Sequence, residues 1–92
     1  WIDGYHFEKS FLADCYKNSL ALAVENDITT ISFPSISTGV YRFPVELASK
    51  VAVQAIYDFL QQNNTIELVQ MVCFDDKTYK TYKSACEEIF GY

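Results

Sequence analysis

The residues with the clearest capacity for chemistry form a short stretch, residues 35–41, with the sequence Ser-Ile-Ser-Thr-Gly-Val-Tyr. Three of its hydroxyl side chains lie close to Gly39, which has no Cβ and lets the backbone turn sharply or approach a ligand. An apolar run, residues 28–33, precedes the stretch, and a helical pattern that opens at Pro44 follows it. A loop between a strand and a helix can present backbone N–H groups to an anion. The stretch is therefore either a phosphate or diphosphate site, or a connection whose glycine and hydroxyls only form the turn and cap the helix.

One histidine and three cysteines are the other side chains with catalytic potential. His6 lies in a polar stretch, residues 1–10, that is expected to form a loop, so it is either an acid–base group or a solvated side chain. Cys15, Cys73 and Cys86 are odd in number, widely spaced and set in apolar patterns. We expect buried free thiols in a reducing compartment, because neither the spacing nor the histidine content suits a zinc site. None lies in a loop beside a base, so no thiol nucleophile is expected.

Composition limits the classes of partner. The chain has 92 residues, half of them hydrophobic, which allows one domain at most. Its formal net charge of −5 argues against binding to nucleic-acid backbones or to anionic membrane surfaces. No apolar run approaches the roughly 20 residues that span a bilayer. We expect a cytoplasmic protein with no nucleic-acid or membrane partner, no metal and no resident cofactor. The sequence begins with Trp1 instead of Met, so the true N-terminus is expected to be missing.

Apolar spacing predicts three helices, at about residues 8–26, 44–62 and 77–90. Two short and nearly continuous apolar runs, residues 28–33 and 66–74, are typical of strands buried on both faces. Asp75 is expected to cap the last helix. The predicted inward helix faces are Leu12, Cys15, Tyr16, Ser19, Leu20 and Ala23; Ala48, Val51, Ala52, Ala55, Ile56 and Phe59; and Tyr79, Tyr82, Cys86 and Ile89.

This α-β-α-β-α order indicates an α/β fold in which a helix connects two parallel strands. A parallel sheet needs both faces covered, and two strands alone leave unpaired edges. The chain is therefore expected to be the C-terminal part of a larger α/β domain, or to complete its sheet with another chain. Ligands of such sheets bind beyond the carboxyl ends of the strands, where residues 35–41 and 74–76 both lie.

Taken together, these patterns resemble a macrodomain, the three-layer α/β/α family that binds ADP-ribose. The resemblance covers essentially the whole chain and is nearly residue for residue over 31–41. It implies that residues 1–92 are the C-terminal portion of a single macrodomain, without the N-terminal strands and first ligand loop. The other matching segments are residues 1–4, 15–20, 23–26, 43–46 and 72–75, with Leu12, Ala48, Tyr79 and Tyr82.

The resemblance also implies roles for single residues. The backbone of residues 37–40 would cradle the diphosphate of ADP-ribose, and Tyr41 would pack against the distal ribose or serve only as a packing aromatic. Phe74 and Asp75 would lie near the adenine-ribose side, or act as a core residue and a helix cap. Arg42 replaces a glycine of many relatives and could pair with a phosphate, crowd the distal ribose or remain solvated. The implied ligand-binding set is Ser35, Ser37, Thr38, Gly39, Val40, Tyr41, Arg42, Phe74 and Asp75.

In function, the resemblance implies a small-molecule ligand, ADP-ribose or a derivative. The parent domain would hydrolyse O-acetyl-ADP-ribose, ADP-ribose 1''-phosphate or ADP-ribosyl protein. Its catalytic residues cannot be assigned, because the family's catalytic first loop has no counterpart in this sequence. Two alternatives are a reader of ADP-ribose without catalysis and an inert portion of the domain.

Overall fold

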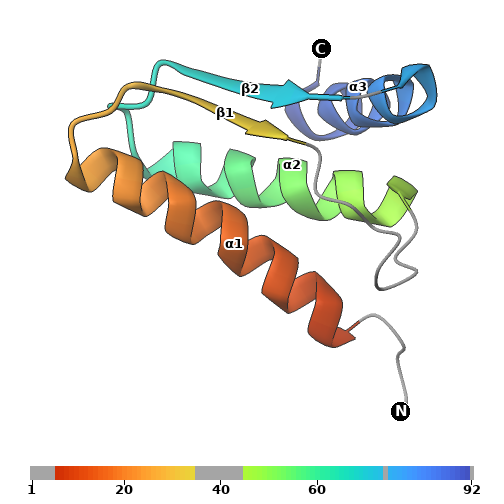
Figure 1. The fold of residues 1–92 in the computed structure, drawn as a ribbon, viewed down its shortest axis with the longest axis horizontal. Helices are drawn as coiled ribbons and strands as arrows, with labels where there is room; N and C mark the ends of the chain where they lie inside the picture. The colour runs from red at the N-terminus through yellow and green to blue at the C-terminus, as the bar shows by residue number, and fades with distance from the viewer. Residues whose placement is uncertain (1–5, 35–44, 74, 92) are drawn as a thin grey trace.

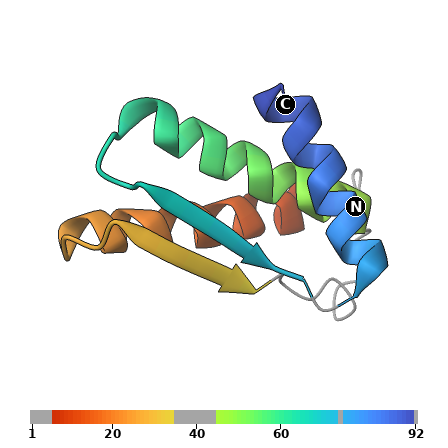
Figure 2. The same cartoon turned by 90° about the horizontal axis from the view of Figure 1, so that it is seen from above.

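A computed structural model describes residues 6–34, 45–73 and 75–91, with side chains described from residue 10 onward. The elements follow the order α1 (His6–Glu25), β1 (Thr30–Pro34), α2 (Val45–Gln62), β2 (Leu68–Val72) and α3 (Asp76–Phe90). Figure 1 shows α1 and α2 beneath the sheet, and α3 runs beside α2 near the end of β2, as Figure 2 shows from above. This arrangement confirms the predicted α/β class and element order.

The two strands form a parallel pair in which Thr30 lies opposite Leu68 and Pro34 lies opposite Val72. Within the described part of the chain this is a two-stranded sheet, as the sequence predicted. Side chains alternate between a face turned toward the helices and an exposed face, so the expected burial on both faces is not observed. The reason is that α1 and α2 cover one face only. The exposed positions are Thr30, Ser32, Pro34, Leu68, Gln70 and Val72.

α1 begins earlier than the sequence suggested. The polar stretch before Ser10 was expected to be a loop, but helical backbone starts at His6. The physical reason is that the last strong helix breaker before this segment is Gly4, and Glu8 is favourable in a first helical turn, where the macrodipole attracts negative charge. The interpretation of His6 as a loop residue is therefore wrong.

α2 occupies the centre of the core. It packs against α1 on one side and α3 on the other, so it buries more than the single stripe predicted from its periodicity. Ser49 and Val53 are buried in addition to the predicted alanines, while Val51 and Phe59 are half-buried. The alanines Ala48, Ala52 and Ala55 are almost fully buried, and their small side chains let the neighbouring backbones approach closely.

Two tyrosines carry polar atoms into this core. Tyr16 of α1 is fully buried and packs edge-to-face against Phe33 of β1, with ring centroids 4.9 Å apart. Tyr82 of α3 is 4% exposed. Burial raises the pKa of Tyr82, and the nearby phenol of Tyr16 opposes part of this rise. The two phenols thus lie near each other in the core, one on α1 and one on α3.

α3 faces the core with Tyr82 and Ala85, which are buried, and with Cys86 and Ile89, which are half-buried. The prediction that Tyr79 belongs to this face is wrong, since Tyr79 is 56% exposed. Tyr79 lies in the first turn of α3, one turn before the first buried residue of this face, Tyr82. The helix ends at Gly91, whose φ of 85° is left-handed and whose N–H donates to the Glu87 carbonyl at 3.0 Å.

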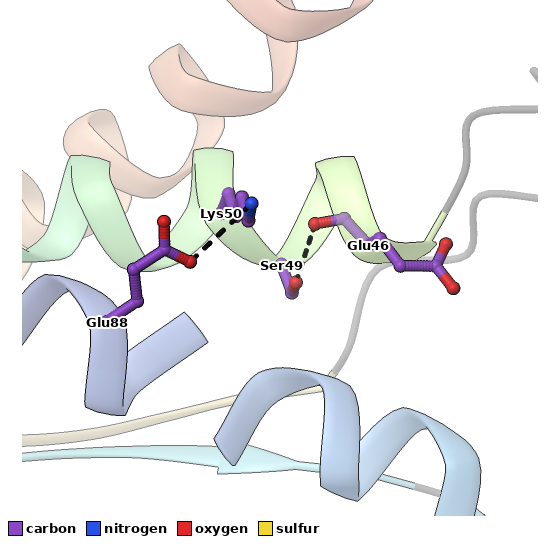
Figure 3. Close-up of polar contacts among 4 residues, drawn as sticks. All are labelled: Glu46, Ser49, Lys50 and Glu88. Atoms are coloured by element: carbon purple, nitrogen blue, oxygen red, sulfur yellow. Dashed lines mark hydrogen bonds and ion pairs between the residues drawn. The ribbon is translucent and has the colours of Figure 1, made fainter. Parts of the chain in front are cut away.

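Polar contacts at the α2 surface are drawn in Figure 3. The buried hydroxyl of Ser49 donates to the backbone carbonyl oxygen of Glu46 at 2.9 Å, which satisfies it within its own helix. Lys50 and Glu88 form an ion pair between α2 and α3, with 3.5 Å between Nζ and Oε2. Both side chains are more than half exposed, so this pair adds little to stability.

Candidate functional site

The described part of the candidate site is the edge of the sheet at which both strands end. Because Pro34 and Val72 lie opposite each other, the chain leaves β1 and β2 at neighbouring points. α2 begins at Val45 and α3 at Asp76, and their N-terminal ends lie toward the tips of the strand arrows (Figures 1 and 2). Helix N-termini carry partial positive charge and unpaired N–H groups. This edge can therefore hold an anion with main-chain groups alone.

Most of the predicted ligand-binding residues lie outside the described residues. This holds for the segment between β1 and α2 and for the residue after Cys73. The predicted residues concerned are Ser35, Ser37, Thr38, Gly39, Val40, Tyr41, Arg42 and Phe74.

Asp75 is the one predicted ligand-binding residue that the structure describes. Its backbone is extended, with φ −150° and ψ 166°, and its Oδ1 accepts a hydrogen bond from the Thr78 N–H at 2.7 Å. This geometry confirms the helix-cap alternative. The hydrogen bond from Thr78 lowers the pKa of Asp75, and the charge of Lys77 adds to the effect against a smaller opposing effect of desolvation. One orphan N–H at the start of α3 is thus satisfied by the protein's own carboxylate.

The cysteines near this edge are poor nucleophiles. Burial raises the pKa of Cys73, and the negative charge of Asp75 raises it further. Burial also raises the pKa of Cys86, with smaller contributions from Cys73 and Glu87. Because the thiolate is the reactive form, both environments suppress reactivity. All three cysteines are free, as expected, but each is only partly buried, so the expectation of buried thiols is met in part. Their positions lie at the borders of the core instead of its centre.

Sequence reasoning missed the electrostatic effect of Asp75 on Cys73, although the two residues lie only two positions apart in the sequence. Two further properties concern only the described part of the chain. Its side chains contain no group of three histidine, cysteine, aspartate or glutamate residues able to hold a metal ion. None of its helices has the length and apolar character needed to cross a bilayer.

Known proteins with similar sequences belong to one family. Residues 2–52, more than half of the chain, match the Macro domain family. A Macro domain-containing protein of Chlorobaculum tepidum is 45% identical over 85 residues, which is 92% of this chain and 49% of that protein. An O-acetyl-ADP-ribose deacetylase of Klebsiella pneumoniae is 47% identical over 83 residues, which is 90% of this chain and 47% of the enzyme.

Solved structures agree with the sequence relatives. The macrodomain of Oceanobacillus iheyensis with ADP has a TM-score of 0.87 and 37% identity, covering 99% of this chain and 47% of that chain. The Trypanosoma brucei macrodomain in complex with ADP has a TM-score of 0.78 and 32% identity, covering 84% of this chain and 34% of that chain.

The α/β architecture with its parallel strand pair and the match over residues 2–52 define one class of protein. The chain belongs to the Macro domain family. It spans about half the length of the curated relatives it matches. The resemblance stated from the sequence is confirmed.

Proposed function

We propose that this chain contributes the diphosphate-binding side of an ADP-ribose site. The observation that carries the proposal is the paired ending of β1 and β2, where Pro34 lies opposite Val72. Gly39 permits close approach of the ligand to the backbone. The ADP-bound macrodomains among the structural neighbours support a nucleotide ligand of this class.

Within this site, main-chain N–H groups bind the negatively charged diphosphate of the ligand. The protein has a formal net charge of −5, and Glu46, Asp75 and Asp76 are carboxylates at or near the same edge. Long-range attraction of an anion is therefore weak, and oriented N–H groups act at short range instead. Such groups are fixed before the ligand arrives, so they hold the diphosphate without reorganisation. Tyr41 and Arg42 would then contact the distal ribose or phosphate, and Phe74 the adenine-ribose side.

We further propose that residues 1–92 form the C-terminal portion of a macrodomain whose remaining strands complete the sheet. Two observations support the proposal that part of the domain is missing from these residues. One face of the strand pair is exposed, and the chain covers only about half the length of each relative. Such a domain would hydrolyse O-acetyl-ADP-ribose, ADP-ribose 1''-phosphate or ADP-ribosyl protein, with water attacking a distal ribose that the diphosphate clamp positions. Hydrolysis is supported by the deacetylase relative, whereas two ADP complexes support binding itself. A reader without catalysis is therefore the second candidate.

Calorimetric titration of the chain with ADP-ribose tests the binding proposal. We expect saturable binding, and we expect Gly39→Val to weaken it because a branched side chain blocks the approach of the diphosphate. Gly91→Ala is the matched control, since Gly91 ends α3 away from the strand tips. Adenosine, which has no diphosphate, should bind much more weakly than ADP-ribose. Unchanged affinity in Gly39→Val would refute the assignment of the loop.

Turnover separates the two candidate functions. The full-length polypeptide should release acetate from O-acetyl-ADP-ribose if the domain is a hydrolase. Binding of ADP-ribose without release of acetate, of phosphate from ADP-ribose 1''-phosphate or of ADP-ribose from modified protein would favour the reader.

A further inference from the structure

The solvent-facing side of α3 carries a distinct pattern of charges. α3 packs chiefly against α2, and Figure 2 shows it at the side of the helical layer. Three of the seven cationic residues of the chain lie on this helix, and their side chains are all exposed. They are Lys77, Lys80 and Lys83, which we call the lysine row. None of the three belongs to the predicted ADP-ribose site.

Helical spacing puts these charges in a definite order. Residues that lie four, then three, then four positions apart share one side of a helix, so four exposed charges form a line that reads acidic, basic, basic, acidic. They are Asp76, Lys80, Lys83 and Glu87. Lys77 lies three residues before Lys80 and widens the basic centre of the line. The lysine row thus extends roughly 9 Å along α3, at about 1.5 Å per residue, with a carboxylate near each end.

The lysine row works against the stability of α3. Lys77 is the second residue of the helix, where the positive end of the macrodipole disfavours a cation. Within the row, like charges three positions apart repel each other. Asp76 and Glu87 are spaced to pair with the lysines one turn away, but among the described side chains the ion pair that forms is that of Lys50 with Glu88. Local preferences that are broken without compensation are typical of functional surfaces.

Charge complementarity indicates the kind of partner. We propose that the lysine row of α3 binds an acidic peptide segment of another protein, in which two or three neighbouring carboxylates are flanked by basic residues. The carboxylates lie over the lysine row, and the flanking cations meet Asp76 and Glu87. This contact requires no ADP-ribose, so it goes beyond the proposed function and does not depend on it.

Two other occupants match this face less well. A nucleic-acid backbone is negative along its whole length, so it meets a carboxylate at both ends of the lysine row, on a chain whose formal net charge is −5. A second copy of α3 presents the same order of charges, so a symmetric contact centred on the row places lysines opposite lysines. A short acidic segment with basic flanks avoids both conflicts.

An NMR titration of the 92-residue chain at low ionic strength tests the proposal. The probe is a capped synthetic peptide of alanine, glutamate and lysine, with three glutamates in its centre and three lysines divided between its ends. The control peptide has the same composition and net charge, but its lysines are central and its glutamates are at the ends. We expect saturable shifts at the amides of residues 77–84 with the probe, and binding of the control that is weaker by about tenfold or more. Added salt should weaken binding of the probe.

Two charge reversals form a matched pair. Lys80→Glu should weaken binding of the probe by about tenfold, because it replaces attraction by repulsion at the centre of the row. Lys17→Glu makes the same change in net charge at an exposed position of α1 and should change the affinity by less than about twofold. Lys80→Glu should also keep or raise the urea midpoint, since it turns two repulsive contacts within the row into attractive ones. Loss of binding then cannot come from loss of structure.

Several results would overturn the proposal. They are the absence of saturable shifts with the probe, shifts that spare α3, equal binding of the control peptide, equal weakening by the two reversals, and a clearly lower urea midpoint for Lys80→Glu. A single-stranded oligonucleotide that binds α3 more tightly than the probe would assign the row to nucleic acid instead. Shifts at α3 that grow with chain concentration in the absence of peptide would assign it to a second copy. The titration with ADP-ribose is made without peptide, so either proposal can fail alone.

Discussion

Leu20 offers a sharp test of how this small core is held together. Its side chain is fully buried in the core cluster that joins α1 to α2. Replacement by alanine removes three carbon groups, which at about 0.8 kcal/mol each is roughly 2.4 kcal/mol of lost transfer free energy. The cavity left behind adds to this, so Leu20→Ala should lower the free energy of unfolding by about 3–4 kcal/mol.

The magnitude matters because the chain is short. At about 0.05–0.15 kcal/mol per residue, a chain of this length has roughly 5–14 kcal/mol of stability in total. Leu20→Ala would therefore remove about a fifth or more of it. Leu22 on the same helix is 59% exposed and provides the control. Leu22→Ala should change stability by less than about 0.5 kcal/mol, since surface substitutions are usually that small and alanine suits a helix.

Urea unfolding followed by far-ultraviolet circular dichroism measures both variants. We expect a clearly lower midpoint for Leu20→Ala with an unchanged slope, and a midpoint near the parent value for Leu22→Ala. Equal shifts in the two variants, or a loss below about 1 kcal/mol at Leu20, would show that the helices do not form this close-packed layer in solution.

Three further predictions concern the site and the surface. Asp75→Asn should keep the α3 cap but remove the pH dependence of its contribution to stability. Because the pKa of Asp75 is lowered in the folded protein, the carboxylate stabilises the fold above about pH 4 and loses this effect below it. The stability difference between parent and variant should therefore shrink on acidification, and a constant difference in urea midpoints at pH 7 and pH 3 would contradict this. Tyr41→Ala should weaken ADP-ribose binding by roughly 1–2 kcal/mol in calorimetry, and an unchanged affinity would leave Tyr41 as a packing residue only. Glu88→Gln breaks the exposed ion pair with Lys50 and should change the unfolding free energy by less than about 0.5 kcal/mol, so a larger loss in urea titration would mean that the pair is more shielded than its exposure indicates.

The elements of the fold were predictable because each has a strong local signal. The apolar spacing of α2 and its end near Gln62 required no knowledge of its neighbours. The cap of α3 was visible in Asp75, whose position before the helix allows its side chain to meet the Thr78 N–H. The strand boundaries moved by two residues, to Thr30 and Leu68, because pairing in register, and not hydrophobicity alone, defines where a strand begins.

What the sequence could not predict depends on how elements meet. Periodicity assigns one buried stripe to a helix, but α2 lies between two helices, so Ser49 and Val53 are buried as well. The same limit applies to Tyr79. Its spacing places it on the same helix face as Tyr82, but it lies in the first turn of α3 and is exposed. At the candidate site, the type and order of residues 35–41 carry the prediction of a ligand loop, and these residues lie outside the described part of the chain. The burial that raises the pKa of Cys73 depends on how β2 packs against the helices, which the sequence alone does not give.

The central position of α2 also bears on the kinetics of folding. Its ion pair with α3 joins Lys50 to Glu88, and the strand pairing joins Thr30 to Leu68, so both contacts link residues that lie 38 positions apart. The entropy of loop closure depends on this separation and is therefore similar for the helical layer and for the sheet. We therefore expect the two layers to form together in one cooperative step, so that the carboxyl edge of the strands takes shape with the core and not after it.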